Sequence, residues 1–149
     1  MLGEVEVLVV EPRRLAAVRR QATLAELPAT VAAALAAVHS VLDRQAIAGG
    51  RDVVLYHDQA FDLAIGVEVA AALPPDVSDQ NVAAAETPGG RVATVAYWGP
   101  EEELTLAHTA IARQCFAAGL RVAGPSWEVF GDEAAGPEGR RTDVFYLLR

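Results

Sequence analysis

Apolar residues recur along this chain at strand and helix spacings, and the same series of spacings occurs twice. The first series predicts a strand over residues 5–22 bent near Pro12, a helix over 27–46, and a hairpin of strands over 52–57 and 61–69. The second predicts a strand over 92–98, a helix over 101–118, and strands over 127–131 and 142–148. The pattern therefore indicates two successive units of strand, helix and hairpin.

The helix of the first unit has a regular apolar face. Val31, Leu35, Val38 and Leu42 follow one another at steps of four, three and four residues, which places them on one side of a helix. Thr23 and Glu26 have the spacing of a capping box, and Gly49-Gly50 is expected to end the helical segment.

The helix of the second unit begins with three acids at positions 101–103, after Pro100. Acidic side chains there compensate the positive end of the helix dipole, so we assign them no metal. The buried face is expected to consist of Leu104, Ala107, Ile111 and Cys115. Gly119 is placed to terminate the helix.

Gly, Pro, Asp and Ser divide the chain between these elements. Residues 58–60 are expected to form a hairpin turn, residues 131–141 a polar loop, and residues 71–90 a connector between half-repeats of about 1–70 and 91–149. We interpret residues 1–149 as a single domain. Two half-domains that pack their sheets together leave a cleft at the seam, and such clefts are frequent ligand sites.

Charge and composition exclude several functions. The 149 residues carry a formal net charge of −8, which disfavours nucleic acid as a direct ligand and favours cationic partners. All 12 basic residues are arginines, so Schiff-base chemistry and a phosphate-binding loop lysine are excluded.

Cysteine and histidine usage gives little sign of a cofactor. Cys115 is the single cysteine, which suits a reducing cytosol, and no signal peptide or membrane span is recognisable, so we expect a soluble cytoplasmic protein. His39, His57 and His108 have no second ligand at a metal-binding interval. We therefore expect neither a metal site nor a cofactor.

Three segments together resemble the GyrI-like small-molecule-binding domains, which also serve as effector-binding domains of multidrug-sensing transcription regulators. The segments are residues 97–104 (YWGPEEEL), 123–130 (AGPSWEVF) and 142–146 (TDVFY). The resemblance covers most of the chain. It implies an α+β fold in which duplicated β-α-β-β units form a concave antiparallel sheet with two helices on one face, as in GyrI-like or SHS2-type domains.

The resemblance also implies a central aromatic pocket with a carboxylate at its floor. Glu128 matches that carboxylate, whereas a lone acid on a strand more often faces solvent. Strand alternation places Ser126, Glu128 and Phe130 on one face and Trp127 and Val129 on the other. The expected ligand-binding residues are Glu128, Phe130, Tyr146, Trp98 and Tyr56.

Three classes of function remain open. The first is a stand-alone module that binds hydrophobic, cationic small molecules for sensing or sequestration, without an attached DNA-binding region. The second, also drawn from the resemblance, is a cofactor-independent hydrolase of reactive electrophiles, with Glu128 as general base and Tyr146 orienting or protonating the leaving atom. The third is a protein-interaction module comparable to a gyrase inhibitor, which has no support from an acidic tail.

Overall fold

The computed structural model describes residues 1–58, 61–74, 81–131 and 139–149. Its elements run in this order: β1 (Glu6–Val10), β2 (Arg14–Gln21), α1 (Leu27–Arg44), β3 (Asp52–Tyr56), β4 (Asp62–Glu68), β5 (Ala83–Glu86), β6 (Gly90–Trp98), the 3-10 helix η2 (Glu101–Glu103), α2 (Thr105–Ala118), β7 (Val122–Phe130) and β8 (Arg141–Leu148). All eight strands belong to one antiparallel sheet in the order β1-β6-β8-β7-β3-β4-β2-β5. The α+β class expected from the sequence is confirmed.

The sheet is built from two copies of one β-α-β-β arrangement. In the first copy β4 lies between β2 and β3, and in the second β8 lies between β6 and β7. The copies meet where β3 pairs with β7, from Asp52 opposite Phe130 to Tyr56 opposite Ser126. The duplication inferred from the repeated pattern is therefore present in the fold.

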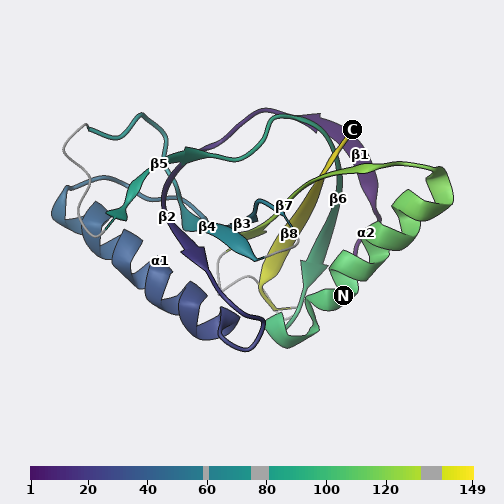
Figure 1. Cartoon of the computed structure of the whole chain (residues 1–149), viewed down its shortest axis with the longest axis horizontal. Coiled ribbons are helices and arrows are strands. Elements are labelled where there is room, and N and C mark those ends of the chain that lie inside the picture. The colour runs from purple at the N-terminus through teal and green to yellow at the C-terminus, as the bar shows by residue number, and fades with distance from the viewer. Residues whose placement is uncertain (59–60, 75–80, 132–138) are drawn as a thin grey trace.

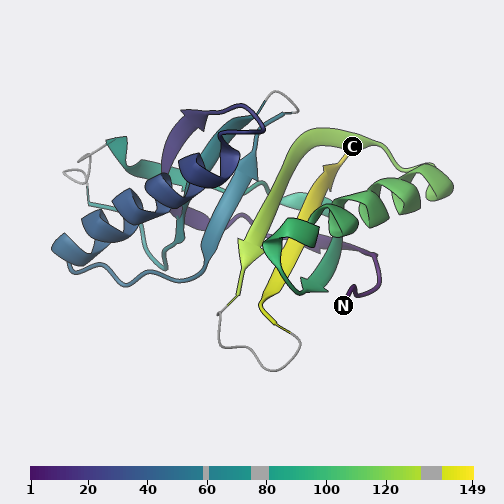
Figure 2. The same ribbon diagram turned by 90° about the horizontal axis from the view of Figure 1, so that it is seen from below.

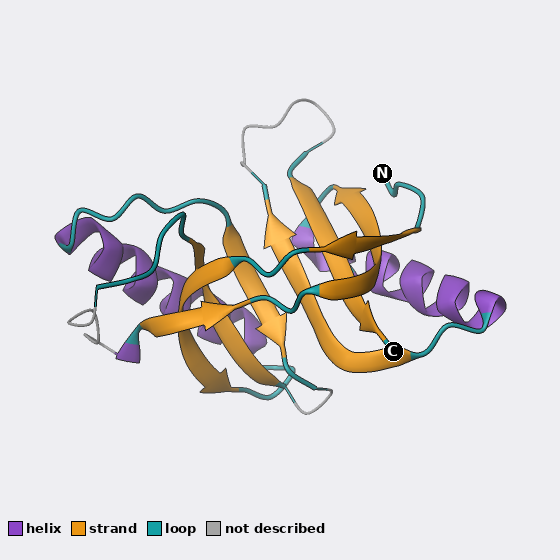
Figure 3. Ribbon diagram, turned by 90° about the horizontal axis from the view of Figure 1, so that it is seen from above, coloured by secondary structure: helices purple, strands orange, loops and turns teal. Residues whose placement is uncertain are grey.

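The strand expected to bend near Pro12 is shared between the two copies. β1 pairs with β6 of the second copy, whereas β2 pairs with β4 of the first. The segment expected to be a plain connector contains β5, which pairs with β2, so that prediction was incomplete. Arg13, between β1 and β2, bonds to Thr87, between β5 and β6. The Arg13 amide donates to the Thr87 hydroxyl and the Thr87 amide donates to the Arg13 carbonyl, each at 2.9 Å. The β1–β2 and β5–β6 connections thus run side by side from one half of the sheet to the other (Figure 3).

Both helices cover the same face of the sheet, one over each copy (Figures 1 and 2). Side chains alternate between the two faces, so Val54 belongs to the apolar cluster under the helices and Val53 to the cluster on the opposite face. Leu15 of β2 and Val92 of β6 join that second cluster. The central strands are therefore buried on both sides.

Helix boundaries differ in detail from the expectation. α1 ends at Arg44 instead of residue 46, because Ala46 has a positive φ of 55° that no helix accommodates. The expected capping box forms a turn before the helix, with Thr23 N 2.9 Å from Glu26 Oε1 and Glu26 N 3.3 Å from Thr23 Oγ1. Gly119 ends α2 in the left-handed conformation, as predicted.

The second hairpin also differs from the expectation, because β7 begins at Val122 rather than residue 127. The pairing of β7 with β8 is irregular between Val122 and Ser126, where Gly124 has a φ of +123°. Residues 59–60 of the expected turn, 75–80 of the connector and 132–138 of the polar loop lie outside the described residues. Within the described chain, neither helix is long and apolar enough to cross a membrane.

Candidate functional site

A cavity of about 790 Å³ lies between α1 and α2, over the central strands of the sheet. Apolar side chains of α1 and of Leu24, just before it, form one wall of the cavity. Residues of η2 and α2 form the opposite wall. The floor comes from β3, β7 and β8. The described lining residues are Leu24, Leu27, Pro28, Val31, Ala32, Leu35, Val54, Tyr56, Asp58, Phe61, Glu101, Glu102, Leu104, Thr105, His108, Val122, Gly124, Ser126, Glu128, Phe130 and Tyr146.

Glu128 lies at the floor of this cavity, on the central strand β7. It is only 6% exposed, and it stands opposite Val54 of β3 and Val144 of β8. Both neighbours are fully buried aliphatic residues, so the carboxylate is surrounded by low-dielectric groups at the level of the sheet. The expected alternation along β7 is confirmed, because Phe130 belongs to the apolar cluster under the helices, whereas Trp127 and Val129 belong to the cluster on the opposite face.

Two polar side chains satisfy the Glu128 carboxylate. His108 Nε2 lies 2.7 Å from Oε2, and the Tyr56 hydroxyl donates to Oε1 at 3.3 Å. A buried carboxylate without partners is strongly destabilising, and these two contacts offset part of that cost. The same contacts tie α2 to β7 and β3.

His108 extends the network to a second tyrosine. Its Nδ1 lies 2.7 Å from the Tyr146 hydroxyl, and the two rings meet edge to face with centroids 5.6 Å apart. The four side chains Tyr56, Glu128, His108 and Tyr146 therefore form one continuous hydrogen-bonded chain across the cavity. They come from β3, β7, α2 and β8, so the chain joins both copies of the repeat.

Burial keeps both tyrosines of this chain protonated. Desolvation, followed by the nearby Glu128 charge, raises the pKa of Tyr56 far above its usual range. Desolvation and then Glu128 also raise the pKa of Tyr146, while a hydrogen bond from Ser126 acts in the opposite direction. At neutral pH both residues therefore present phenolic O–H groups inside the site.

The cavity is acidic. Its described lining includes the carboxylates of Asp58, Glu101, Glu102 and Glu128 and contains no arginine. Arg140 lies nearby and is engaged at several points. Its Nη1 is 3.2 Å from Glu101, its Nε donates to the Gly131 carbonyl at 2.8 Å, and its guanidinium carbon lies 5.0 Å from the Phe130 ring centroid.

Four of the five residues expected to bind a ligand line this one cavity: Glu128, Phe130, Tyr146 and Tyr56. Trp98 is not among the lining residues. The Arg141 guanidinium carbon lies 5.2 Å from the centroid of its ring. The ring is also close to Gly3, where an added Cβ atom would lie 3.7 Å from a ring carbon. Trp98 thus belongs to the outer end of β6, away from the carboxylate.

Sequence reasoning missed His108 and Phe61 as lining residues. His108 follows Leu104 by four residues and precedes Ile111 by three, so it lies on the inward stripe of α2. That spacing was the available signal. Phe61 meets Tyr56 edge to face at 6.3 Å, but it follows the turn at residues 58–60 and carried no periodic signal.

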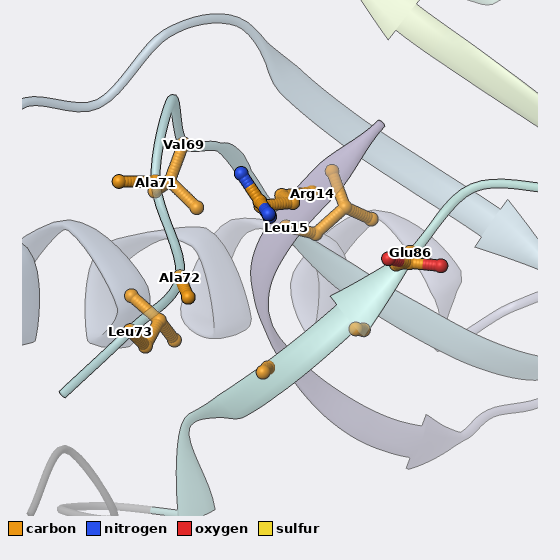
Figure 4. A pocket seen from close by; sticks show the side chains of 9 residues that line it. Arg14, Leu15, Val69, Ala71, Ala72, Leu73 and Glu86 are labelled. Atoms are coloured by element: carbon orange, nitrogen blue, oxygen red, sulfur yellow. The ribbon is translucent and has the colours of Figure 1, made fainter. Parts of the chain in front are cut away.

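A second cavity, of about 420 Å³, lies between the Val69–Leu73 segment and β5 (Figure 4). Its charged lining residues among those described are Arg14 and Glu86, and the Arg14 side chain donates to the Ala70 carbonyl at 3.4 Å. No buried polar side chain points into it from the described lining. The larger cavity is therefore the candidate functional site.

Among the described residues, no group of three or more His, Cys, Asp or Glu side chains is arranged to hold a metal ion. The acids of η2 instead form the first turn before α2.

Comparison with known proteins identifies the fold. No protein-family model matches the sequence, and no curated protein matches it. Among solved structures, the C-terminal domain of EcmrR aligns over 100% of this chain and 99% of that chain, with a TM-score of 0.74 and 13% identity. In the cryo-EM structure of the EcmrR–DNA complex, the match covers 98% of this chain and 57% of that chain, with a TM-score of 0.80 and 13% identity.

Two further structures share the fold over nearly their whole length. SAV2435 bound to tetraphenylphosphonium aligns over 98% of this chain and 94% of that chain, with a TM-score of 0.70 and 9% identity. A hydrolase from Listeria innocua aligns over 98% and 92%, with a TM-score of 0.62 and 12% identity. At these identities the likeness shows the fold alone, and that fold is GyrI-like, as the three sequence segments indicated.

Proposed function

We propose that this domain binds hydrophobic cations in the cavity between α1 and α2, for sensing or sequestration. Glu128 supplies the counter-charge at the floor, and Tyr56, Phe130 and Tyr146 supply aromatic surface. The observation that carries the proposal is a carboxylate only 6% exposed at the base of a cavity of about 790 Å³. A cytoplasmic location, expected from the single cysteine, is part of the same proposal.

The electrostatics of the cavity favour a positive ligand. Four carboxylates line it, while its described lining contains no arginine and the chain contains no lysine. A lipophilic cation carries its charge with a weak hydration shell, so it loses little on entering an apolar cavity and gains the attraction of a desolvated carboxylate. Aromatic faces add a favourable interaction with the same charge.

The shape of the cavity suits a bulky apolar ligand. Leu27, Val31 and Leu35 of α1 face the sheet across the cavity, so apolar surface is available opposite the carboxylate. The volume lies within the range of about 300 to 1,000 Å³ that is typical of small-molecule sites. The structural neighbour SAV2435 was solved with tetraphenylphosphonium, a ligand of this chemical type, which supports the proposal by analogy.

A thermal-shift titration tests the proposal with two ions of the same shape and opposite charge. Tetraphenylphosphonium is expected to raise the melting temperature by mass action, and tetraphenylborate is expected to have no effect. Glu128→Gln should abolish the shift. Glu6→Gln is the matched control, because it removes one charge from the exposed strand β1, and it should leave the shift unchanged. Equal stabilisation by both ions would contradict the proposal.

A hydrolase is a second candidate, because Glu128 and Tyr146 face one cavity and are joined through His108. Glu128 would act as general base toward water, and Tyr146 would protonate the leaving atom of a reactive electrophile. One structural neighbour is a hydrolase from Listeria innocua. Mass spectrometry of epoxide or activated ester probes incubated with the protein tests this candidate. Conversion that is lost in both Glu128→Gln and Tyr146→Phe would support it, and full recovery of every probe would exclude it.

A further inference from the structure

We infer that His108 sets the charge selectivity of the cavity, because a cation binds beside Glu128 only while the imidazole is neutral. Cation capture is then coupled to release of a proton from His108. The inference rests on the proposed function, since it specifies how the same cavity chooses its ligand. It is carried by the position of the imidazole between Glu128 and Tyr146.

The two imidazole nitrogens have different neighbours. Nε2 faces the Glu128 carboxylate at 2.7 Å, and an ionised carboxylate only accepts hydrogen bonds, so Nε2 carries a proton in both charge states of the ring. Nδ1 faces the Tyr146 hydroxyl at 2.7 Å, and this group both donates and accepts. The proton gained or lost by His108 is therefore the one at Nδ1.

Each charge state gives the cavity floor a different character. With neutral His108, Tyr146 donates to Nδ1, and the pair of His108 and Glu128 carries a net charge of about −1 that a cation can neutralise. With protonated His108, the imidazolium already neutralises Glu128 at hydrogen-bond distance. A cationic ligand then meets an ion pair and a positive ring in place of an available carboxylate.

The other charged groups around His108 do not provide a second basic group. His108 contacts Glu128 of β7 and Tyr146 of β8 directly, and Tyr56 of β3 is linked to it through Glu128. Across the cavity mouth, Glu101 and Glu102 come from η2 and Asp58 from the end of β3. On α2 itself the neighbouring lining residue is the uncharged Thr105. Arg140 reaches Glu101 and the Phe130 ring, and it is not among the described lining residues.

His108 is therefore the single basic side chain among the described residues that line the cavity. Imidazoles titrate between about pH 5 and 8, whereas the two buried tyrosines stay protonated there. When a ligand binds only the deprotonated state of a linked group, its apparent dissociation constant rises by up to about tenfold for each pH unit below the pKa of that group. Binding of a cation should weaken as the pH falls.

The experiment measures the dissociation constant of tetraphenylphosphonium from pH 5.5 to 8.5 by isothermal titration calorimetry. Wild-type protein is expected to bind about tenfold or more weakly at pH 5.5 than at pH 8. His108→Gln keeps an amide donor for Glu128 and cannot titrate, so its affinity should vary less than about threefold. His39→Gln is the matched control, since His39 is exposed and pairs with Asp52 at 2.8 Å. It should retain the wild-type profile.

A second readout does not depend on any variant being well folded. In wild-type protein near pH 6, binding should release protons, so the measured heat should change with the ionisation enthalpy of the buffer. The absence of proton release, or the same pH profile in wild type and His108→Gln, would overturn the inference and leave the proposed function intact. Absence of tetraphenylphosphonium binding at every pH would overturn both. Tighter binding of tetraphenylborate than of the cation at high pH would also contradict the charge assignment.

Discussion

Tyr56 and Tyr146 stand on either side of the same residue, because both pair in register with Ser126 of β7. The two phenols thereby reach the Glu128–His108 pair from opposite strands, one through the carboxylate and the other through the imidazole. This arrangement places one tyrosine from each copy of the repeat at the floor of a single cavity. A tyrosine-to-phenylalanine substitution at either position therefore removes one hydroxyl group and leaves the other in place.

Removal of the two hydroxyls should have unequal effects on stability. Tyr146→Phe leaves His108 Nδ1 without its 2.7 Å partner and should lower the free energy of unfolding by about 1 to 2 kcal/mol. Tyr56→Phe removes a 3.3 Å bond and should cost less than about 1 kcal/mol. Urea denaturation monitored by circular dichroism measures both. An equal or reversed order would contradict this description of the network.

The limits of the ligand site can be tested with two aromatic residues. Phe130→Ala removes a ring that lines the cavity, so binding of tetraphenylphosphonium should weaken by about tenfold, given the roughly 1 to 2 kcal/mol of an aromatic contact with a cation. Trp98→Phe should leave the affinity unchanged, because Trp98 lies against Arg141 outside the cavity lining. A fluorescence competition assay measures the dissociation constant of tetraphenylphosphonium for both variants. A loss of affinity in Trp98→Phe would move the site toward β6.

Much of the site follows from local patterns in the sequence. Strand periodicity placed Ser126, Glu128 and Phe130 on one face because successive side chains of a strand point to opposite sides, and the register of β7 keeps that order. The resemblance then predicted that the face of Glu128 binds the ligand, and in the structure that face lines the larger cavity. His108 was considered only as a metal ligand and set aside on its spacing. Its contact with Glu128 was missed, because hydrogen bonds between a helix and a strand depend on how the two pack.

The features that were missed depend on long-range contacts. β5 has the composition AAAE, which carries no alternating pattern, and it becomes a strand through pairing with β2. Trp98 was expected in the site as the residue that ends the first strand of the second unit. In the structure its ring instead contacts the guanidinium of Arg141, its partner in the pairing of β6 with β8.

Two glycines should respond differently to the same substitution. A Cβ on Gly66 would lie 2.0 Å from the Ala16 carbonyl oxygen and 2.7 Å from Ala17 Cα, so Gly66→Ala must separate β4 from β2. We expect a loss of about 3 kcal/mol or more. Gly119→Ala meets nothing within 4 Å and has only its left-handed backbone to strain, at a cost of about 1 kcal/mol. Thermal and urea unfolding would measure both, and similar losses would contradict the close strand approach.

The stability of the protein should fall in mild acid because of His57, at the end of β3. Its buried Nε2 has no hydrogen-bond partner among the described residues, and burial, followed by the Arg19 charge, lowers the pKa of its imidazole in the folded state. The unfolded chain has an imidazole pKa of about 6.5, so it takes up a proton more readily than the folded chain. The stabilisation by neutral His57 is therefore present above that value and is lost as the pH falls through the lower, folded-state pKa.

His57→Gln should flatten this dependence between pH 7 and 5. His39→Gln is the matched control, because His39 is an exposed imidazole bonded to Asp52, and it should leave the contribution of His57 in place. The measurement is the free energy of unfolding from urea titrations at several pH values, compared between wild type and the two variants so that shared carboxylate contributions cancel. An unchanged slope in His57→Gln would show that the acid sensitivity arises elsewhere in the chain.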